Sequence, residues 1–407
     1  MNERRFDVVI AGAGPAGATS ALRLARAGFH VAIVEPCEFP RAKPCGEFMS
    51  PECLPLLREL GVATAVEQLG GRGVSGMALH AAGRRVVGRF ATIGRAAPPI
   101  EHGLAVRREK FDAVLLDAAL ATGGVTLLTG HRVQRLLRGD GGRVEGVVTQ
   151  ARDGAPLRLR ARWTVGADGV RSQVARELGV RRELPWLKKV ALTTHLAGVT
   201  WGDEAEVHFF AGGYFACAPV DDGLLSLNLV VDQSAWRGRQ RESGFAEFLA
   251  RVPKLQEKLA GARRAAPLRG VGAMACRTTR QVVDGAALVG DAAGYIDPVT
   301  GEGIFFALKG AELLAESVEA ALHGGRRDAA ALAGYQRGRA KEIVARCRLA
   351  TLLQRGLRRE TIVRAAFALL EARPRLADLI VSVTGDYVPM RELLRPSVWK
   401  AALTSSS

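Results

Sequence analysis

The feature that most constrains this chain is a glycine-rich turn between two short apolar strands close to the N-terminus. Residues 6–11 are apolar except for Asp7, and residues 8–10 are β-branched, which is typical of a buried strand. The turn GAGPAG follows at residues 12–17, and small and apolar residues then recur at helical spacing through residues 18–28. A second apolar strand at residues 30–35 ends in an acid. This order of strand, turn, helix and strand predicts a βαβ unit that binds a dinucleotide.

The glycines of the turn each meet a different physical requirement of that unit. Gly12 permits the tight turn, Gly14 lets the backbone approach a pyrophosphate, and Gly17 lets the helix pack close to the strand. Pro15 and Ala16 stand at the start of the helix, where free N–H groups and the positive dipole end favour phosphates. All five residues are therefore predicted to bind the cofactor.

The acid at the end of the second strand narrows the choice of ligand. Glu35 lies eighteen residues after Gly17, where a carboxylate accepts hydrogen bonds from ribose hydroxyls. A negative charge at this position disfavours a 2′-phosphate. The sequence therefore predicts FAD or NAD rather than NADP at this site.

Composition excludes several other classes of protein. The chain has 407 residues, which suits two or three packed domains, and a formal net charge of +16. The basic residues are spread along the chain without a nucleic-acid motif, so no nucleic-acid partner is expected. No uninterrupted run of about 18 to 20 apolar residues is present, so no transmembrane helix is expected.

The cysteine pattern points to neither a metal site nor disulfides. The six cysteines form no CxxC pair and match no zinc-ligand spacing, so no metal is predicted. The chain is large and shows no signal peptide, so a reducing cytoplasm is expected. The cysteines are Cys37, Cys45, Cys53, Cys217, Cys276 and Cys347.

Two distant segments repeat the arrangement of an apolar strand, a Gly/Asp turn and a helix. One is WTVGADGVRS at residues 163–172, and the other is ALVGDAAG at residues 287–294. The second is followed by Asp297-Pro298 and by GEGI at residues 301–304. Such junctions place backbone N–H groups and a carboxylate at the carboxyl edge of a sheet, where ligands bind.

With the N-terminal fingerprint, these segments resemble the FAD-dependent aromatic hydroxylase and geranylgeranyl reductase superfamily, which has the p-hydroxybenzoate hydroxylase fold. The resemblance implies FAD as the cofactor. It also implies an α/β fold: a Rossmann-like FAD-binding domain, an inserted and mainly antiparallel β-sheet substrate domain, and a C-terminal helical region. The expected FAD-binding domain covers residues 1–70, 100–185 and 270–330, the substrate domain 71–99 and 186–269, and the helical region 331–407.

The resemblance also assigns cofactor contacts at matching positions. Asp291 is expected to bind a ribityl hydroxyl, and Asp168 and Gly169 to lie near the pyrophosphate. For the two aspartates, helix capping is the alternative role. The further expected contacts are Arg108, Val133 on the adenine side, and Gly301, Gly303 and Ile304 at the flavin ring.

The stretch PRAKPCGEF at residues 40–48 resembles the PRxKxCGG loop of geranylgeranyl reductases, with Glu47 where a glycine is usual. It is also similar to the PRxxxGE stretch of flavin halogenases and related hydroxylases. In that family this loop covers the flavin, so Cys45, Gly46 and Phe48 become expected cofactor contacts. Cys45 is also a candidate catalytic residue, and its alternative role is that of a small buried apolar side chain.

The substrate domain is predicted from four strand-like segments at residues 188–199, 205–211, 214–220 and 224–231, with a hairpin within 74–90. The sequence YFACAP from Tyr214 resembles the YxWxFP element of geranylgeranyl reductases, with alanines replacing its two large side chains. These replacements predict a roomier pocket and weigh against an isoprenoid. Tyr214, His195 and His208 are polar pocket candidates. His208 is a candidate acid or base, and a structural histidine is its alternative.

The last quarter of the chain is predicted to be helical, with helices over 305–323, 329–357 and 360–372. Arginines alternate with leucines between Arg346 and Arg359. Two interpretations remain open: a helical cap over the pocket with a solvated basic face, or a surface that lies peripherally on the inner face of a membrane.

Four functions compete. The first is hydroxylation of a small hydrophobic substrate, such as an aromatic polyketide or phenolic lipid, with NADPH or NADH as a transient reductant. The second is reduction of carbon–carbon double bonds, as in geranylgeranyl reductases. The third function is halogenation, although the WxWxIP signature of tryptophan halogenases is missing. The fourth is that of a redox-inactive FAD-binding scaffold. A separate flavin-reducing partner is an alternative source of electrons.

Overall fold

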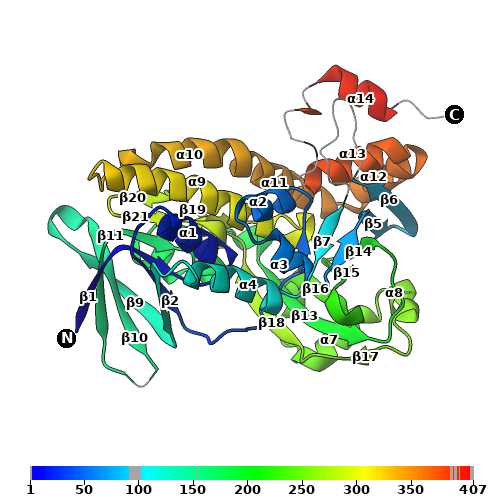
Figure 1. Ribbon diagram of the computed structural model, residues 1–407. Coiled ribbons are helices and arrows are strands. Elements are labelled where there is room, and N and C mark those ends of the chain that lie inside the picture. Colours follow the sequence, from blue (N-terminus) through cyan, green and yellow to red (C-terminus); the bar gives the residue numbers. More distant parts are fainter. Residues whose placement is uncertain are drawn as a thin grey trace.

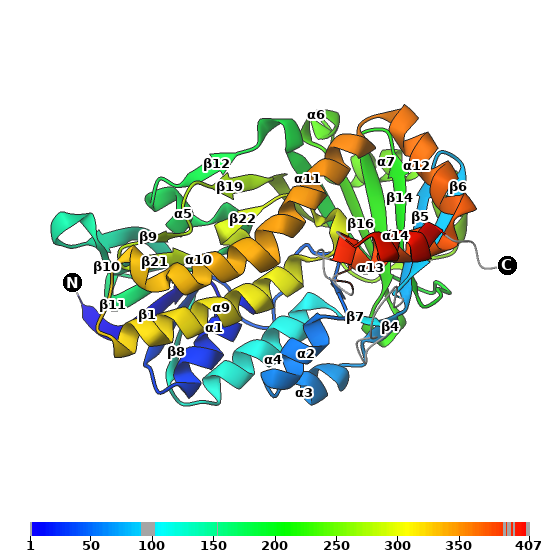
Figure 2. The same ribbon diagram turned by 90° about the horizontal axis from the view of Figure 1, so that it is seen from above.

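The computed structural model describes residues 2–90, 102–152, 154–385, 388, 392–393 and 395–403. Over these residues the chain forms two large sheets at opposite ends of the molecule, with helices packed over and between them (Figures 1 and 2). The predicted fold class, an α/β fold with an inserted, mainly antiparallel sheet and a C-terminal helical region, is confirmed. The boundary predicted between residues 99 and 100 lies outside the described residues.

The first sheet contains the N-terminal fingerprint. Its path runs β20-β21-β11-β1-β2-β8, and the neighbours from β21 to β8 are parallel. Strand β10 joins β11 to β9 by antiparallel pairing. The strands are β1 Glu3–Ala11, β2 Val31–Glu35, β8 Val125–Thr129, β9 His131–Arg138, β10 Val144–Ala151, β11 Leu157–Gly166, β20 Val282–Val283 and β21 Ala286–Leu288.

Three helices cover one face of the first sheet and form the main core with it. Leu22, Phe111 and Leu314, one from each helix, are completely buried there. Both faces of the central parallel strands are covered, which explains why residues 8–11 of β1 and 31–34 of β2 are continuous apolar runs. The helices are α1 Pro15–Arg26, α4 Arg108–Leu120 and α9 Gly303–His323.

The second sheet has the order β17-β13-β16-β15-β14-β5-β6, with β18 beside β13. All pairs except β14 with β5 are antiparallel. The four predicted strands and the predicted hairpin are confirmed. The strands are β5 Gly76–Ala81, β6 Arg84–Arg89, β13 Lys189–Ala197, β14 Glu204–Phe210, β15 Gly213–Pro219, β16 Leu225–Asp232, β17 Arg263–Arg264 and β18 Arg269–Met274.

The two faces of the second sheet have different neighbours, because successive side chains of a strand point to opposite faces. Leu227 and Leu229 of β16 point toward α7 and α8 and pack in an apolar core with Phe248. Asn228 and Val230 of the same strand point the other way. The helices of this region are α6 Gln233–Trp236, α7 Arg241–Leu249 and α8 Pro253–Lys258.

Smaller elements connect the two sheets. Two three-stranded sheets have the orders β12-β19-β22 and β3-β7-β4. Their strands are β3 Phe48–Met49, β4 Arg72–Val74, β7 Gly103–Ala105, β12 Arg181–Glu183, β19 Cys276–Thr278 and β22 Gly294–Tyr295. The short helices are α2 Cys53–Glu59, α3 Ala63–Glu67 and α5 Gln173–Glu177.

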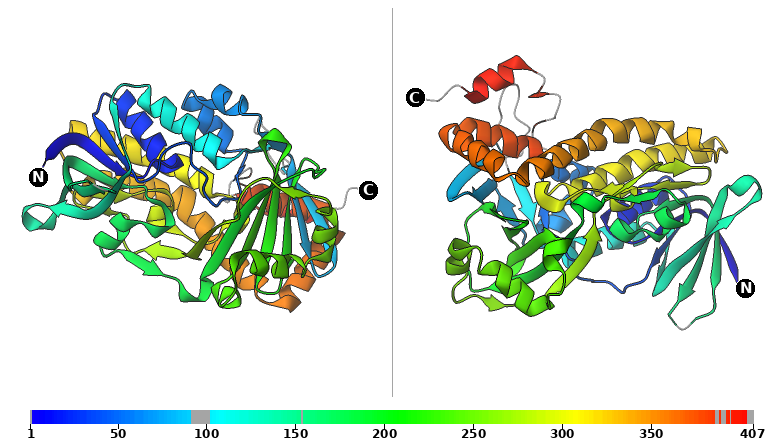
Figure 3. Two further views of the ribbon diagram at one scale, coloured as in Figure 1. Left: turned by 90° about the horizontal axis from the view of Figure 1, so that it is seen from below. Right: turned by 180° about the vertical axis from the view of Figure 1, so that it is seen from behind.

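The C-terminal helices run from the first sheet toward the second (Figures 2 and 3). The single helix predicted over residues 329–357 is instead a 3₁₀ turn, a helix, a π-helical segment and a further helix. The π-helical segment, Ala340–Val344, widens the backbone where Ile343 reaches the cavity described below, and such segments are common at functional sites. The helices are α10 Ala333–Arg339, α11 Ala345–Leu357, α12 Glu360–Ala372, α13 Pro374–Thr384 and α14 Pro396–Leu403.

Within the described part of the chain, no helix has both the length and the apolar character needed to cross a membrane.

Candidate active site

One large cavity connects the carboxyl edge of the first sheet with the second sheet. Its wall includes Gly14 before α1, Asp291 after β21, Gly303 at the start of α9, and Ala216 and Asn228 of the second sheet. The empty space, including its open mouth, is about 1570 Å³. The cavity therefore reaches from the predicted dinucleotide-binding turn to the second sheet.

Most of the predicted cofactor contacts meet in this cavity. They come from six separate segments of the chain. The residues that line it are Gly14, Pro15, Ala16, Cys45, Gly46, Phe48, Arg108, Gly169, Asp291, Gly301, Gly303 and Ile304.

The turn before α1 has the geometry that its glycines predict. Gly12 has a φ of +99°, and a Cβ atom there would lie 2.6 Å from the carbonyl oxygen of Ala167. A Cβ atom on Gly17 would lie 1.9 Å from the carbonyl oxygen of Gly12. Helix α1 begins without an acidic side chain in its first turn and without a side-chain cap. Its first N–H groups are therefore available to an anionic ligand.

Glu35 and Val133 lie behind the cavity wall rather than on it. The Glu35 carboxylate is buried, accepts hydrogen bonds from the backbone N–H groups of Ala13 at 2.8 Å and Cys37 at 3.1 Å, and pairs with Arg41. It therefore fixes the glycine turn in place. Val133 of β9 is buried in the core on the other side of the first sheet. The direct contacts of these two residues with the cofactor stay predictions.

Asp168 caps a helix, which was the alternative role considered for it. One carboxylate oxygen accepts hydrogen bonds from the N–H groups of Gln173 at 2.6 Å and Val174 at 3.2 Å, at the start of α5. The other oxygen is buried without a hydrogen-bond partner among the described residues. Burial raises the pKa of Asp168. Because neighbouring Gly169 lines the cavity, the free oxygen lies next to the region expected for the pyrophosphate.

The middle of the cavity holds one carboxylate between two cations. Burial raises the pKa of Asp291, and the charges of Lys43 and Arg108 act against that shift. Within the described part of the chain, the Asp291 carboxylate accepts no hydrogen bond, so it is available to a ligand hydroxyl. Burial alone would lower the pKa of Arg108, but two bonds to Asp112, at 2.6 and 2.8 Å, raise it and fix the guanidinium.

The far end of the cavity is formed by the start of α9 and the loop that carries Cys45. Gly301 adopts the left-handed conformation, with a φ of +73°, and turns the chain into α9. Gly303 faces open space, because a Cβ atom there would have no neighbour within 4 Å. No side chain caps this 21-residue helix at its N-terminus. The helix therefore directs unpaired N–H groups toward the place expected for the flavin ring.

Glu47 occupies a strained position in the Cys45 loop. Its φ is +59°, a left-handed conformation that favours glycine, and this explains why a glycine is usual there in the geranylgeranyl reductases that the loop resembles. Two contacts hold it: one carboxylate oxygen accepts from the N–H of Arg108 at 3.1 Å, and the other lies 2.6 Å from His195 Nε2. The structure thus brings His195 of β13 to the loop.

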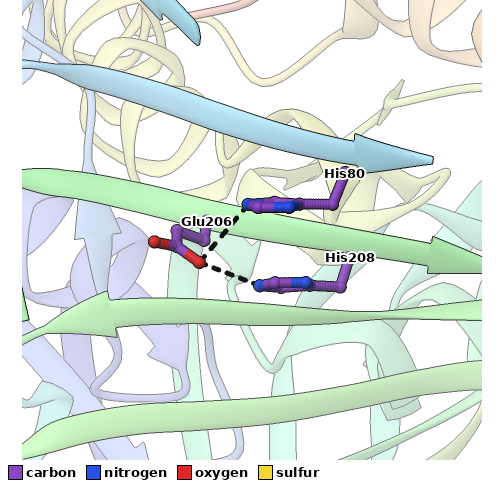
Figure 4. Close-up of side chains that lie close together, drawn as sticks. All are labelled: His80, Glu206 and His208. Atoms are coloured by element: carbon purple, nitrogen blue, oxygen red, sulfur yellow. Dashed lines mark hydrogen bonds and ion pairs between the residues drawn. The ribbon is translucent and has the colours of Figure 1, made fainter. Parts of the chain in front are cut away.

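His208 does not reach the cavity. It lies on β14 with its side chain toward the α7 and α8 face of the second sheet, beside Glu206 and His80 (Figure 4). The cavity is lined by the opposite face, through residues such as Ala216 and Asn228. We therefore give His208 no part in the chemistry of the cavity. Alternate residues of a strand point to opposite faces of the sheet, and the sequence alone did not show which set of residues faces the cofactor.

Sequence reasoning missed Glu302, which lines the cavity directly before Gly303. The side chain is buried, and Arg346 Nη1 lies 3.6 Å from Glu302 Oε1. Burial raises the pKa of Glu302 to about 7, while a hydrogen bond from Thr300 and the charge of Arg346 act in the other direction. The only signal in the sequence was an acid between two glycines, immediately before an apolar helix.

Tyr214, a pocket candidate from the sequence, lines the cavity and belongs to a polar network at the boundary between the second sheet and α11. The sequence did not predict the other members of this network. The Tyr214 hydroxyl donates to Asp297 at 2.8 Å, and Lys189 Nζ lies 3.0 Å from the other oxygen of Asp297. Lys189 also donates to Gln354 of α11 at 2.8 Å. Burial raises the pKa of Tyr214 well above its usual value, so the phenol remains protonated. The network fixes the Asp297-Pro298 turn to the second sheet.

The parallel first sheet, the free helix N-termini and the long cavity define an FAD-dependent oxidoreductase. The chain belongs to the FAD binding domain family, which matches residues 5–348. Digeranylgeranylglycerophospholipid reductase 2 of Methanopyrus kandleri is 31% identical over 346 residues, which cover 81% of each chain. Menaquinone reductase of Mycolicibacterium smegmatis is 28% identical over 334 residues, covering 77% of this chain and 76% of that protein.

The solved structures agree on the fold. The flavin-dependent brominase Bmp2 superposes with a TM-score of 0.82 over 97% of both chains, at 21% sequence identity. At that identity the likeness describes the fold alone. FAD as the cofactor is thus supported by the family, and by a cavity whose donors and acceptors suit it.

Proposed function

We propose that this protein reduces carbon–carbon double bonds in a bulky, apolar substrate of the polyprenyl type. The observation that carries the proposal is the continuity of the cavity, from the flavin-ring positions into a largely apolar chamber that also contains Cys45 and Glu302. Reductases that match this chain over about four fifths of its length support the proposal. Hydroxylation, the first expectation from the sequence, becomes the second candidate.

The residues of the chain would bind and orient the cofactor. The start of α1 would hold the pyrophosphate, Asp291 a ribityl hydroxyl, and the start of α9 the flavin ring. Reduced FAD supplies a hydride when it is bound. We propose NADH or NADPH, or a separate flavin-reducing partner, as the source of its electrons.

The chamber beyond the flavin positions suits a substrate without charge. Its wall in the second sheet includes Ala191, Ala216, Val230 and Met274. Ala216 stands where the YxWxFP element of geranylgeranyl reductases has tryptophan, so this part of the wall leaves more space. An apolar wall also excludes water from the reacting carbons. We therefore expect a bulkier substrate than a linear isoprenoid chain alone.

Reduction of a double bond needs a proton for the second carbon, and Glu302 is our candidate donor. It is a buried carboxyl on the cavity wall, and its pKa of about 7 suits proton transfer near neutral pH. Cys45 also lines the cavity and accepts a hydrogen bond from the N–H of Glu47 at 3.4 Å. It stays a second candidate for assisting the chemistry.

Hydroxylation of an aromatic or phenolic lipid is the second candidate because one polar pair stands in the apolar chamber. Thr193 donates to Asn228 at 2.6 Å, and both residues line the cavity. A phenolic hydroxyl is a partner that such a pair can hold. The same binding pair serves a quinone or phenol head group in the first proposal.

A lipid-like substrate would be extracted from a membrane, and the exposed side of α11 is a suitable surface for contact with that membrane. Leu352 is 61% exposed, and Trp186 is 37% exposed beneath the guanidinium groups of Arg355 and Arg358. Apolar and basic side chains together favour peripheral contact with anionic lipid. Vesicle co-sedimentation of the FAD-loaded protein tests this, with Leu352→Ser expected to weaken binding. Equal sedimentation of the variant would argue against the contact.

Product analysis distinguishes the two reactions. The FAD-loaded protein is incubated with NADH or NADPH and with either a polyprenyl lipid that has no quinone ring or a phenolic lipid, with and without oxygen. A quinone ring is avoided because its own reduction would also add two hydrogen atoms. The proposal predicts a product that has gained two hydrogen atoms and forms without oxygen. A product that has gained one oxygen atom, and only in air, would establish hydroxylation instead.

A further inference from the structure

Three side chains on the outer face of the second sheet bring together atoms that ligate metals. His80 comes from β5, while Glu206 and His208 are two residues apart on β14 (Figure 4). Glu206 Oε2 lies 2.9 Å from His208 Nε2 and 3.5 Å from His80 Nε2. The imidazole rings are stacked, with centroids 4.0 Å apart and an angle of 12° between the planes.

This arrangement supplies three of the four positions of a tetrahedral coordination shell. Zinc bonds of roughly 2.0–2.1 Å place neighbouring ligand atoms about 3.3 Å apart, and the two distances to Glu206 Oε2 lie on either side of that value. All three ligand atoms lie within 4.8 Å of one another. A small opening of the stacked rings would direct both nitrogens at a common ion.

The cluster also has one atom that the protein satisfies poorly. His80 Nε2 is buried and makes no well-aligned hydrogen bond in the described part of the chain, since its contact with Glu206 Oε2 is 3.5 Å long. The other Glu206 oxygen is bonded to Lys258, whose ammonium lies 3.6 Å from the centre of the Trp201 ring. That bond orients the carboxylate so that its remaining oxygen faces both histidines, as outer partners of metal ligands commonly do.

We propose that His80, Glu206 and His208 bind one divalent metal ion of the zinc class on the face of the second sheet that is turned away from the cavity. Two imidazoles and a carboxylate are the ligand types that zinc prefers, and a water molecule completes the shell. The site does not depend on the proposed reaction. It revises the expectation of no metal, which rested on cysteine spacing.

The position of the ligands indicates a stabilising role. His80 belongs to the β5–β6 hairpin, while the other two ligands belong to β14, and the two strands pair in parallel at His80 and His208. A metal ion would tie this hairpin to the rest of the second sheet. Binding to the folded state alone raises the melting temperature as metal concentration rises.

Zinc binding to the full-length FAD-loaded protein tests the proposal. The protein is stripped with a chelator, titrated with Zn²⁺ alone in a calorimeter, and analysed for bound metal after desalting. We expect one zinc ion per chain and a higher melting temperature. His80→Gln and His208→Gln should each weaken binding by about tenfold or more. His30→Gln, which removes an exposed histidine elsewhere, should leave binding unchanged.

Two results would overturn the proposal. The first is the absence of bound zinc in the wild-type protein, which would make the cluster a hydrogen-bonded link between strands. The second is zinc that persists in both histidine variants. If the variants do not fold, anomalous diffraction from zinc-soaked wild-type crystals decides the question. A peak beside Glu206 Oε2 supports the site, and a peak only at cysteine side chains rejects it.

Discussion

The two ends of the cavity are built in different ways. At the end near α1, the geometry comes from short contiguous segments, in which Gly12 and Gly17 fix the turn and a helix begins at once. At the other end, Glu302, Asn228 and Ala216 come from three separate segments and meet only through the tertiary fold. The end that holds a common cofactor is thus encoded locally, whereas the end that selects a substrate depends on long-range packing.

The largest effect is expected from Gly17→Val at the cofactor end. A Cβ atom at this position would lie 1.9 Å from the carbonyl oxygen of Gly12, so α1 has to move away from β1. We expect a loss of about 3 kcal/mol in the free energy of unfolding, with little FAD retained. The FAD-to-protein ratio and thermal unfolding measure this. Gly202→Val, on an open loop, is the matched control, and full FAD content in Gly17→Val would contradict the account.

Glu302→Gln tests the substrate end, and should lower turnover by roughly 10²–10⁴-fold while FAD stays bound. Donation needs the protonated carboxyl, whose pKa is about 7. Wild-type turnover should therefore fall as the pH rises through about 7, and the variant should lack this dependence. Steady-state rates across pH measure both effects. An unchanged pH profile in the variant would remove Glu302 from the mechanism.

Asp291→Ala tests the cofactor end of the cavity and is expected to have a smaller effect, on FAD affinity. A hydrogen bond from a ligand hydroxyl to a charged group contributes about 1.5–3 kcal/mol, so FAD affinity should fall by roughly 10–100-fold. Without FAD, the melting temperature should rise, because burial disfavours this carboxylate, as the raised pKa of Asp291 indicates. Titration of the FAD-free protein with FAD measures the first effect and thermal unfolding the second. Equal FAD affinity in both proteins would exclude the assigned contact.

Glu47→Gly should have the smallest effect, and it tests how the two ends are joined. Glycine removes a left-handed strain of about 1–2 kcal/mol but loses the contacts to Arg108 and His195. The two changes should nearly cancel in the free energy of unfolding, which chemical denaturation measures. Turnover should fall a few-fold because the loop loses its contact with β13. Glu47→Gln keeps hydrogen-bonding atoms and is the control. A large loss of stability in Glu47→Gly would show that the contacts outweigh the strain.

The difference between locally encoded and long-range parts of the cavity also explains what the sequence could predict. The fingerprint, the fold class and the four strands of the second sheet follow from local patterns of glycine and apolar residues. His208 was considered both as an acid or base and as a structural histidine, because the alternation along β14 gives two faces without saying which one meets the cofactor. Glu302 was missed because its raised pKa comes from burial, which depends on the whole fold.

The cluster around Glu206 was missed for a similar reason. His80 lies 126 residues before Glu206 in the sequence, and only the parallel pairing of β5 with β14 brings them together. Metal-ligand spacing can be recognised within one strand, but a ligand from a neighbouring strand has no fixed sequence distance. Function that depends on strand pairing is therefore the part that sequence alone conveys least.

The most direct test of the proposed reaction is an anaerobic single-turnover experiment. The protein with fully reduced FAD is mixed with a polyprenyl lipid that has no quinone ring in a stopped-flow instrument without oxygen, because a quinone ring would itself accept the electrons of the flavin. The visible absorbance of oxidised flavin is followed. Double-bond reduction predicts that the absorbance returns, with one hydrogenated product molecule per flavin. An absorbance that returns only when oxygen is admitted, with no hydrogenated product, would contradict the account.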